Sequence, residues 1–201
     1  MKIKIIHSDD YTDNDINDIK ELLINNPDES GNYDVDDWGN KPHTLLYVLF
    51  KDDRFNSERG GLVLIYDNNK LCGISGYNRS TFNSDVYILG ARTIIDKEYR
   101  HRLLMSSYFI PTQIEQVKDK AKMVVFIFDK KNVFNLYDIF TSGKLNLFLK
   151  NKYQEFAHIW DNLKAVEFPI IIYKGTIHNA LYINIDPDYS FDWDSLRANH
   201  V

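Results

Sequence analysis

Positive charge gathers just after a predicted strand, where a helix is predicted to begin. The turn at this point carries three basic side chains and a histidine: Lys97, Arg100, His101 and Arg102. The first N–H groups of a helix have no partner within the helix, and with the helix dipole they attract anions. Neighbouring arginines strengthen this attraction, so the segment is predicted to hold an anion such as pyrophosphate. The residues expected to contact it are Arg100, His101, Arg102, Leu103, Leu104, Met105 and Ser106.

The same segment resembles the coenzyme A loop of the GNAT superfamily of acyl-CoA-dependent N-acyltransferases. In that family a strand of the type V-D-P-E-Y-R leads into R-x-x-G-x-G/A, and the loop wraps the coenzyme A pyrophosphate. Residues 95–100, I-D-K-E-Y-R, match the lead-in, and Arg100 stands at the family's Q/R position. The two family glycines fall at Leu103 and Met105. Glycine lets a backbone approach a phosphate closely, so these two side chains are expected to occupy the phosphate path or to open the loop.

The resemblance implies the cofactor and the reaction. A small-molecule or protein amine would attack the thioester of acetyl-CoA or another acyl-CoA directly, without a covalent enzyme intermediate. Backbone N–H groups near Ile94 and Ile95, with Thr93 beside them, would bind the pantetheine arm and polarise the carbonyl. Asn132 begins a segment that looks like the family's N-x-x-A and would complete the coenzyme A site.

The resemblance also suggests which groups move protons. Tyr137 lies near the position of the family's tyrosine and is the predicted acid for the departing thiolate. No carboxylate in the strand at 86–95 suits the role of base. Asp36, Asp37 and His43, in the part of the chain that family members use around the acceptor, are the candidates for it.

Each candidate also has a purely structural interpretation. Arg100 and Arg102 could be solvated surface residues, and His101 could be exposed without a role. Tyr137 could serve packing alone, and Asn132 could simply cap a helix. Cys72 lies in a predicted strand and is interpreted as a small buried side chain rather than a nucleophile.

Two other functions stay open at this level. A GNAT-fold protein that has lost catalysis and acts as a binding or interaction module would explain the missing glycines. A related acyltransferase of the homoserine-lactone-synthase type would share the core fold and use another acyl carrier. The fold alone does not choose between such functions.

Composition and net charge narrow the classes of function that remain. The 201 residues have a formal net charge of −5, so no global attraction to nucleic acid is expected. No apolar run is long enough to span a membrane. A single cysteine permits no internal disulfide, and a reducing, cytoplasmic location is predicted. The six histidines are scattered without cysteine partners, so no metal site is expected. Acidic residues crowd the stretch 9–37, either as a solvated face or as a surface for a cationic substrate.

Periodicity indicates the elements that position these residues. Strands are predicted at 1–7, 62–66, 71–78, 86–95, 123–128, 168–173 and 179–185. Residues 67–70, D-N-N-K, are predicted to turn a hairpin, because asparagine and aspartate tolerate left-handed conformations. Thr12 or Asp13 is predicted to cap the first helix, and further helices are predicted at 42–50, at 103–120 with an interruption at Pro111, at 132–140 and at 145–156. This order predicts an α/β fold with a mixed central sheet covered by helices on both faces. One domain is expected over 1–186, followed by a polar tail over 187–201, and final strands of this kind permit a homodimer.

Overall fold

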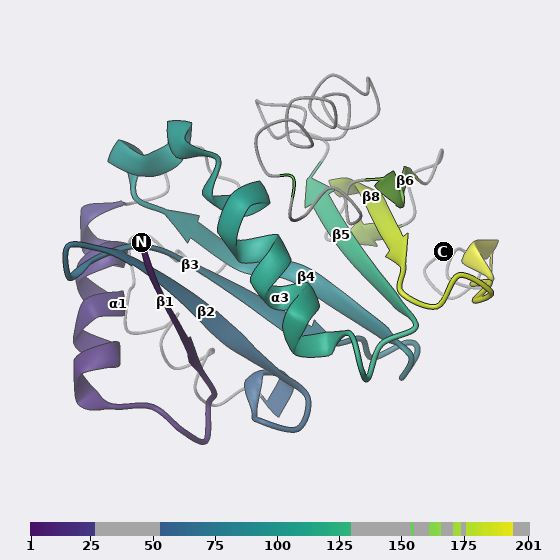
Figure 1. Cartoon of the computed structure of the whole chain (residues 1–201), viewed down its shortest axis with the longest axis horizontal. Helices are drawn as coiled ribbons and strands as arrows, with labels where there is room; N and C mark the ends of the chain where they lie inside the picture. Colours follow the sequence, from purple (N-terminus) through teal and green to yellow (C-terminus); the bar gives the residue numbers. More distant parts are fainter. Residues whose placement is uncertain (27–52, 130–153, 155–160, 166–170, 174–175, 195–201) are drawn as a thin grey trace. The chain divides into compact units, whose positions relative to one another are not determined.

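The computed structural model describes residues 1–26, 53–129, 154, 161–165, 171–173 and 176–194 (Figure 1). The chain divides into two compact units. The first comprises residues 1–79 and 90–113, and the second comprises residues 80–89 and 114–201. Among the described residues, no helix is both long enough and apolar enough to cross a membrane.

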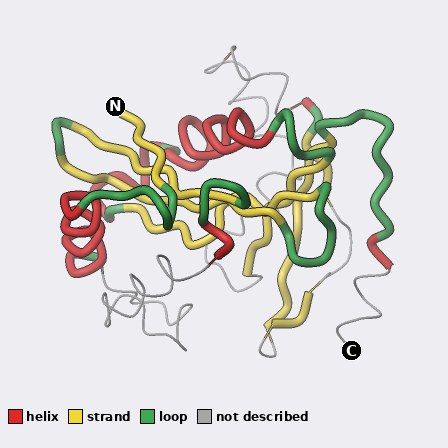
Figure 2. The backbone as a smooth tube through the Cα atoms, turned by 90° about the horizontal axis from the view of Figure 1, so that it is seen from below, coloured by secondary structure: helices red, strands yellow, loops and turns green. Residues whose placement is uncertain are grey.

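The first unit is a sheet with helical segments on both faces. Its strands follow the order β1-β2-β3-β4, and β2 pairs antiparallel with both β1 and β3. Its elements are β1 (Lys2–Ile6), α1 (Asp13–Asn25), η1 (Asp53–Phe55), β2 (Gly60–Asp67), β3 (Lys70–Arg79), the second half of β4 (Val86–Ile95), η2 (Lys97–Arg102) and η3 (Met105–Phe109). Figure 2 shows α1 on one side of the strands and the helical segment that starts at Met105 on the other. The predicted α/β class with helices on both faces is confirmed here.

Alternation along β3 explains how one strand serves both faces. Ile74 packs into a core cluster with Ile19 and Leu23 of α1. Its neighbour Gly73 lies on the opposite face, where a Cβ atom would come within 3.2 Å of the Phe109 ring. Successive side chains of a strand point to opposite faces, so a single apolar strand supports both helical layers.

Two local structures predicted from the sequence are confirmed. Thr12 caps α1 in a capping box, in which Asp15 N–H donates to the Thr12 hydroxyl and the Asp15 carboxylate accepts from Thr12 N–H. Asn68 and Asn69 turn the β2–β3 hairpin with φ of 49° and 68°. Asparagine tolerates this left-handed conformation, and two such residues suit a tight hairpin.

The predicted helix at 103–120 is confirmed over 105–117, but it is not α-helical throughout. After the 3-10 turn of η2 and a left-handed residue at Leu103, the chain makes a π turn at η3 and then α3 (Ile110–Val117). Proline has no N–H for an α-helical bond to the carbonyl four residues before it. Just before Pro111, the Ile110 N–H reaches back to the carbonyl of Met105, which is the wider spacing of a π turn.

The second unit is built around a buried strand. β5 (Met123–Asp129) pairs parallel with the first residues of β4 and antiparallel with β8 (Thr176–Asn184). Short strands β6 (Leu163–Ala165) and β7 (Ile171–Tyr173) pair antiparallel with β8. The sheet is therefore mixed, as predicted, while β6 was not expected from the sequence.

Aromatic side chains beyond residue 186 take part in the core of the second unit. Tyr189, Phe191 and Trp193 pack against a cluster that includes Val125 of β5. The Phe191 and Trp193 ring centroids lie 4.8 Å apart in an edge-on arrangement. The segment expected to be a polar tail therefore contributes apolar surface to this unit, and the extent of a single domain stays a prediction.

Candidate functional site

The predicted anion-binding segment lies in the first unit, directly after β4. Asp96 begins it by accepting a hydrogen bond from Glu98 N–H at 3.0 Å. Leu103 ends η2 with φ 54° and ψ 35°, the left-handed conformation that glycine adopts most readily. Leu104 is already right-handed helical, so the helical segment begins immediately after Leu103. The backbone therefore takes a glycine-like turn without glycine.

The two arginines of this segment have different surroundings. The Arg102 guanidinium lies 3.2 Å from the Asp67 carboxylate and 4.5 Å from the centre of the Tyr99 ring. Arg100 is exposed, and its Nε donates to the Ile95 carbonyl at 3.2 Å. A guanidinium has five N–H donors, so this one bond leaves most of the donor capacity of Arg100 for an anion. Arg102 is paired with Asp67, so Arg100 is the better placed of the two arginines to bind an anion.

The side chains at the two family glycine positions differ in their placement. The terminal methyl of Met105 lies 3.3 Å from where a Cβ atom on Gly90 would stand, so Met105 packs back onto β4. Leu103 is half-buried. Ser106, which follows Met105, is buried, and its hydroxyl donates to the Leu103 carbonyl at 3.2 Å. Of the predicted contacts, His101 is exposed and Leu104 is buried.

A cluster of charged and aromatic side chains holds η2 to the β2–β3 hairpin. Lys70 contacts Asp96 at 3.0 Å and Glu98 at 2.8 Å, and these hydrogen bonds raise the pKa of Lys70. Its ammonium also lies 5.7 Å from the centre of the Tyr99 ring. A hydrogen bond with the Cys72 thiol, burial and the Asp67 carboxylate together raise the pKa of Tyr99 to about 12. The tyrosine therefore stays neutral at physiological pH.

Helix α1 holds the start of η2 from another side. Asn26, at the C-terminal end of α1, accepts a hydrogen bond from Lys97 N–H at 2.8 Å. Its amide nitrogen donates to the Leu22 carbonyl at 2.9 Å. Because Asn26 is buried, both bonds are shielded from water, and η2 is anchored at its first residue.

Strand β4 is distorted just before this loop. Its parallel ladder with β5 spans 86–89, and the next residue, Gly90, has φ 74°. Arg92 is also left-handed, with φ 58°. The buried Gln113 side chain accepts from Gly90 N–H at 3.1 Å, and the Thr93 hydroxyl donates to the Gly90 carbonyl at 2.8 Å. Thr93, predicted near the cofactor, therefore uses its side chain to brace the strand.

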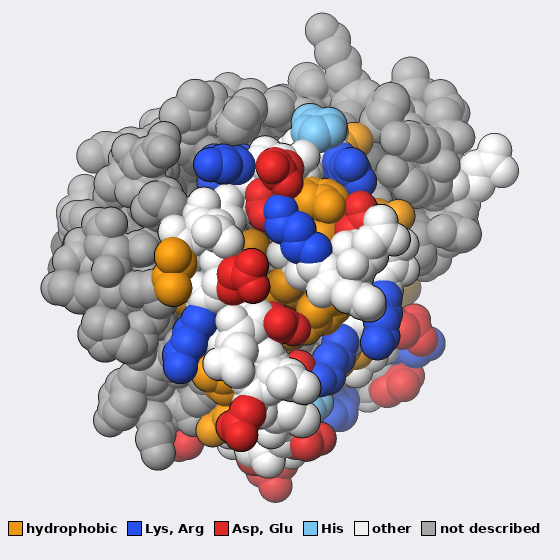
Figure 3. Space-filling model, turned by 90° about the vertical axis from the view of Figure 1, so that its left-hand side faces the viewer, with side chains coloured by type: hydrophobic (Ala, Val, Ile, Leu, Met, Phe, Trp, Pro, Cys, Tyr) orange, Lys and Arg blue, Asp and Glu red, His pale blue; other side chains and the backbone are white. Residues whose placement is uncertain are grey.

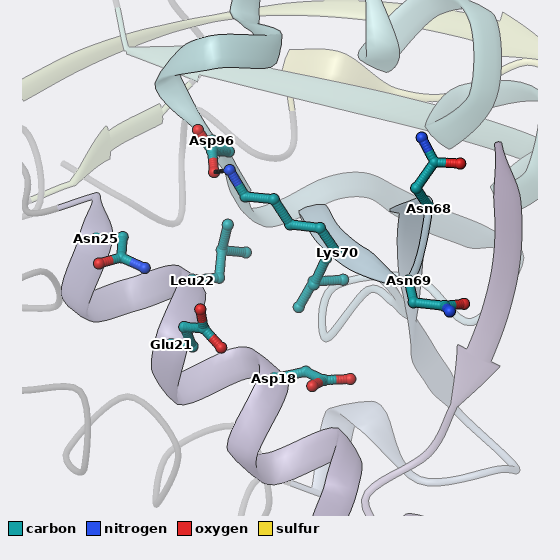
Figure 4. A pocket seen from close by; sticks show the side chains of 9 residues that line it. Asp18, Glu21, Leu22, Asn25, Asn68, Asn69, Lys70 and Asp96 are labelled. Atoms are coloured by element: carbon teal, nitrogen blue, oxygen red, sulfur yellow. Dashed lines mark ion pairs between the residues drawn. The ribbon is translucent and has the colours of Figure 1, made fainter.

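A pocket of about 310 Å³ lies beside the hairpin and is mainly polar. Figure 4 shows Lys70 reaching across it to Asp96, with Asp18 and Glu21 on the opposite helix. Figure 3 shows acidic and basic side chains intermingled on the face that it views. The acidic helix face noted in the sequence thus borders this pocket, whose lining residues are Asp18, Glu21, Leu22, Asn25, Asn68, Asn69, Lys70, Leu71 and Asp96.

The proposed proton-transfer residues lie outside the described residues. This holds for the predicted acid Tyr137 and for the candidate bases Asp36, Asp37 and His43. Asn132, predicted to bind coenzyme A, also lies outside them. The structure does bring together side chains that sequence reasoning did not single out. Ser75 of β3 and Gln113 of α3 are joined by a hydrogen bond of 2.9 Å, and a polar residue within each apolar segment was the only signal that could have pointed to them.

Comparison with solved structures identifies the fold of this chain. No protein-family profile matches the sequence, and no curated protein sequence matches it. A GNAT-family acetyltransferase from Staphylococcus aureus Mu50 is similar in structure, with a TM-score of 0.54 at 17% identity over 92% of this chain and 99% of that one. An N-acetyltransferase from the same organism gives 0.57 at 11% identity with the same coverage. An acyl-CoA N-acyltransferase from Pseudomonas aeruginosa gives 0.51 at 9% identity over 90% and 98%. The chain has the GNAT fold.

Proposed function

We propose that this GNAT-fold chain is an N-acyltransferase that transfers an acyl group from an acyl-CoA to an amine. The observation that carries the proposal is the left-handed turn at Leu103, which starts a helical segment beside the exposed Arg100. This geometry suits a diphosphate because it combines helix-start N–H groups with a guanidinium. Met105, which stands at the second family glycine, packs back onto Gly90.

An acyl-CoA would supply the activated thioester, and the residues of this chain would bind and orient it. The N–H groups at the start of the helical segment, at Leu104, Met105 and Ser106, would bind the diphosphate together with Arg100. Backbone groups of Thr93, Ile94 and Ile95 would align the acyl arm. The hydrogen bonds of Gln113 and Thr93 to Gly90 and the contacts of Asn26 would keep these groups in place.

Proton transfer would complete the reaction. A base would remove a proton from the ammonium form of the acceptor, and an acid would protonate the departing thiolate. Tyr137 stays our candidate for the acid, and Asp37 and His43 stay candidates for the base. The acceptor would be a small-molecule or protein amine, and acetyl-CoA is the simplest donor to test.

Calorimetric titration of the full chain with coenzyme A tests the binding step. We expect Arg100→Ala to weaken binding about tenfold, since a charge-assisted hydrogen bond contributes about 1.5–3 kcal/mol and exposure lowers that value. Lys120→Ala is the matched control, because it removes an exposed positive charge that is not part of the predicted anion-binding segment. Arg102→Ala should weaken binding less than Arg100→Ala. Equal affinities for wild type and Arg100→Ala would contradict the assigned role of Arg100.

Thiol release from acetyl-CoA in the presence of a panel of amines tests the chemistry. Cys72 is buried and burial raises its pKa, so the protein itself should give a low background in this assay. Release that depends on the amine would support the transferase.

A binding module without catalysis is the second candidate. The observation that favours it is the commitment of Arg102 to Asp67, which removes one of the two predicted phosphate-binding cations. Coenzyme A binding without amine-dependent thiol release would support this second candidate. Transfer from another acyl carrier without coenzyme A binding would instead support a synthase-type acyltransferase.

A further inference from the structure

We propose that Gln113 is a positioning residue that holds β4 in its distorted form and thereby aims the backbone of Thr93–Ile95. The structural part of this inference concerns the first unit alone. Its effect on ligand binding rests on the proposed function, in which those backbone groups contact an acyl-CoA.

The distortion of β4 removes Gly90 from regular strand geometry. Gly90 and Arg92 both have positive φ, so the backbone changes direction twice within three residues. A left-handed arginine is unfavourable and persists only where the surroundings enforce it. Polar groups of such a segment must find partners outside the regular ladder when they are buried.

Side chains supply those partners through a closed ring of hydrogen bonds. Gly90 N–H donates to Gln113 Oε1 at 3.1 Å, and Gln113 Nε2 donates to Ser75 Oγ at 2.9 Å. Ser75 Oγ lies 2.8 Å from Thr93 Oγ1. Thr93 Oγ1 donates to the Gly90 carbonyl at 2.8 Å and closes the ring.

The direction of every bond in the ring is determined. A hydroxyl has one hydrogen, and that of Thr93 is used on Gly90, so Ser75 must donate to Thr93. Ser75 can then accept from the amide of Gln113. The second amide hydrogen of Gln113 goes to the Gly76 carbonyl at 3.1 Å, which fixes the orientation of the amide.

Burial makes Gln113 difficult to replace. Gln113 and Ser75 are both fully buried, so water cannot take over their hydrogen bonds. Removal of one member would leave buried donors and acceptors unpaired, and neighbouring bonds in such a ring polarise one another. Gln113 lies in α3, only a few residues after Met105, so it couples the helical segment at the predicted diphosphate site to the strand that would hold the acyl arm.

Gln113→Met in the full chain tests the proposal, because methionine has a similar length and no amide. We expect the amide exchange rate of Gly90 to rise about tenfold by NMR, with smaller increases through Ile95. Coenzyme A affinity should fall about tenfold as the strand loses its alignment. Gln116→Met is the matched control: Gln116 is exposed on the same helix, and its replacement should change neither quantity.

Unchanged exchange at Gly90 in Gln113→Met would overturn the proposal. So would faster exchange with wild-type coenzyme A affinity, because β4 would then move without consequence for binding. If wild type itself binds no coenzyme A, the proposed function fails, and the exchange rates still decide whether Gln113 holds β4.

A second pair of variants covers a loss of folding in Gln113→Met. Thr93→Val removes the hydroxyl that closes the ring, and Thr93→Ser keeps it. Faster exchange at Gly90 in Thr93→Val, with restoration in Thr93→Ser, is the expected result. Equal exchange in both variants would refute the ring as the cause of the strand's geometry.

Discussion

Glycine should be better tolerated than alanine at position 103. Leu103 has φ 54° and ψ 35°, where a residue with a Cβ atom pays about 1–2 kcal/mol relative to glycine. Replacement of Leu103 by either residue also loses the contacts of its half-buried side chain. This loss costs about 1 kcal/mol, because full burial of a leucine is worth about 1.5–3 kcal/mol. This cost is shared, so the difference between Leu103→Gly and Leu103→Ala isolates the backbone conformation.

Glycine also brings extra freedom to the unfolded chain, which offsets about 0.5–1 kcal/mol of the relief. We therefore expect Leu103→Gly to exceed Leu103→Ala by about 1 kcal/mol in free energy of unfolding. For a chain of this size that corresponds to about 2–4 °C in melting temperature. Chemical and thermal denaturation followed by circular dichroism measure both quantities.

At a control position in a regular helix, the difference in stability between the glycine and alanine variants should have the opposite sign. Gln116 is an exposed residue of α3, where glycine should be about 1 kcal/mol less stable than alanine. An alanine variant at position 103 that is as stable as the glycine variant would refute the left-handed turn. Coenzyme A should bind Leu103→Gly at least as tightly as wild type, since glycine allows the backbone to approach a phosphate.

Three further predictions concern the first unit. Thr12→Ala should cost about 1 kcal/mol of stability through loss of the α1 cap, which a denaturant titration would show as a lower midpoint with an unchanged slope. Burial raises the pKa of Asp15, but hydrogen bonds from Lys4 and Thr12 outweigh it and hold that pKa below its ordinary value. Stability from Asp15 should therefore be present above about pH 4 and lost as the pH falls further, and an Asp15→Asn variant should show a flatter dependence in this range. Cys72 should react with a thiol reagent only as fast as the native state opens, because the thiol is buried and its pKa is raised; rapid labelling of the folded chain would contradict its placement.

Local patterns predicted much of the fold because the physics behind them is local. The capping box at Thr12 and the left-handed pair at Asn68 and Asn69 depend on neighbours within four residues. The strand at 86–95 was predicted with the bounds that the structure shows. β6 escaped prediction because three residues carry too little periodicity to identify a strand.

The candidate site was predicted less completely, since its details depend on residues far apart in the chain. Arg102 was grouped with Arg100 from sequence, but its contact with Asp67, 35 positions away, changes its role. Met105 was expected near the phosphate path, and its packing on Gly90 depends on where β4 passes. The predicted acid and base lie outside the described residues and stay predictions.

By itself the sequence determined the α/β class, the order of the strands β1 to β5 and the position of a cationic turn after β4, because composition and hydrophobic periodicity encode these. Tertiary structure alone decided the left-handed turn at Leu103, the π turn before Pro111 and the ring through Gln113. Each of these is unfavourable or unremarkable as a local pattern. Packing against β3, α1 and the β2–β3 hairpin stabilises these three features. The contacts involved join segments that are far apart in the sequence, so no local pattern connects them.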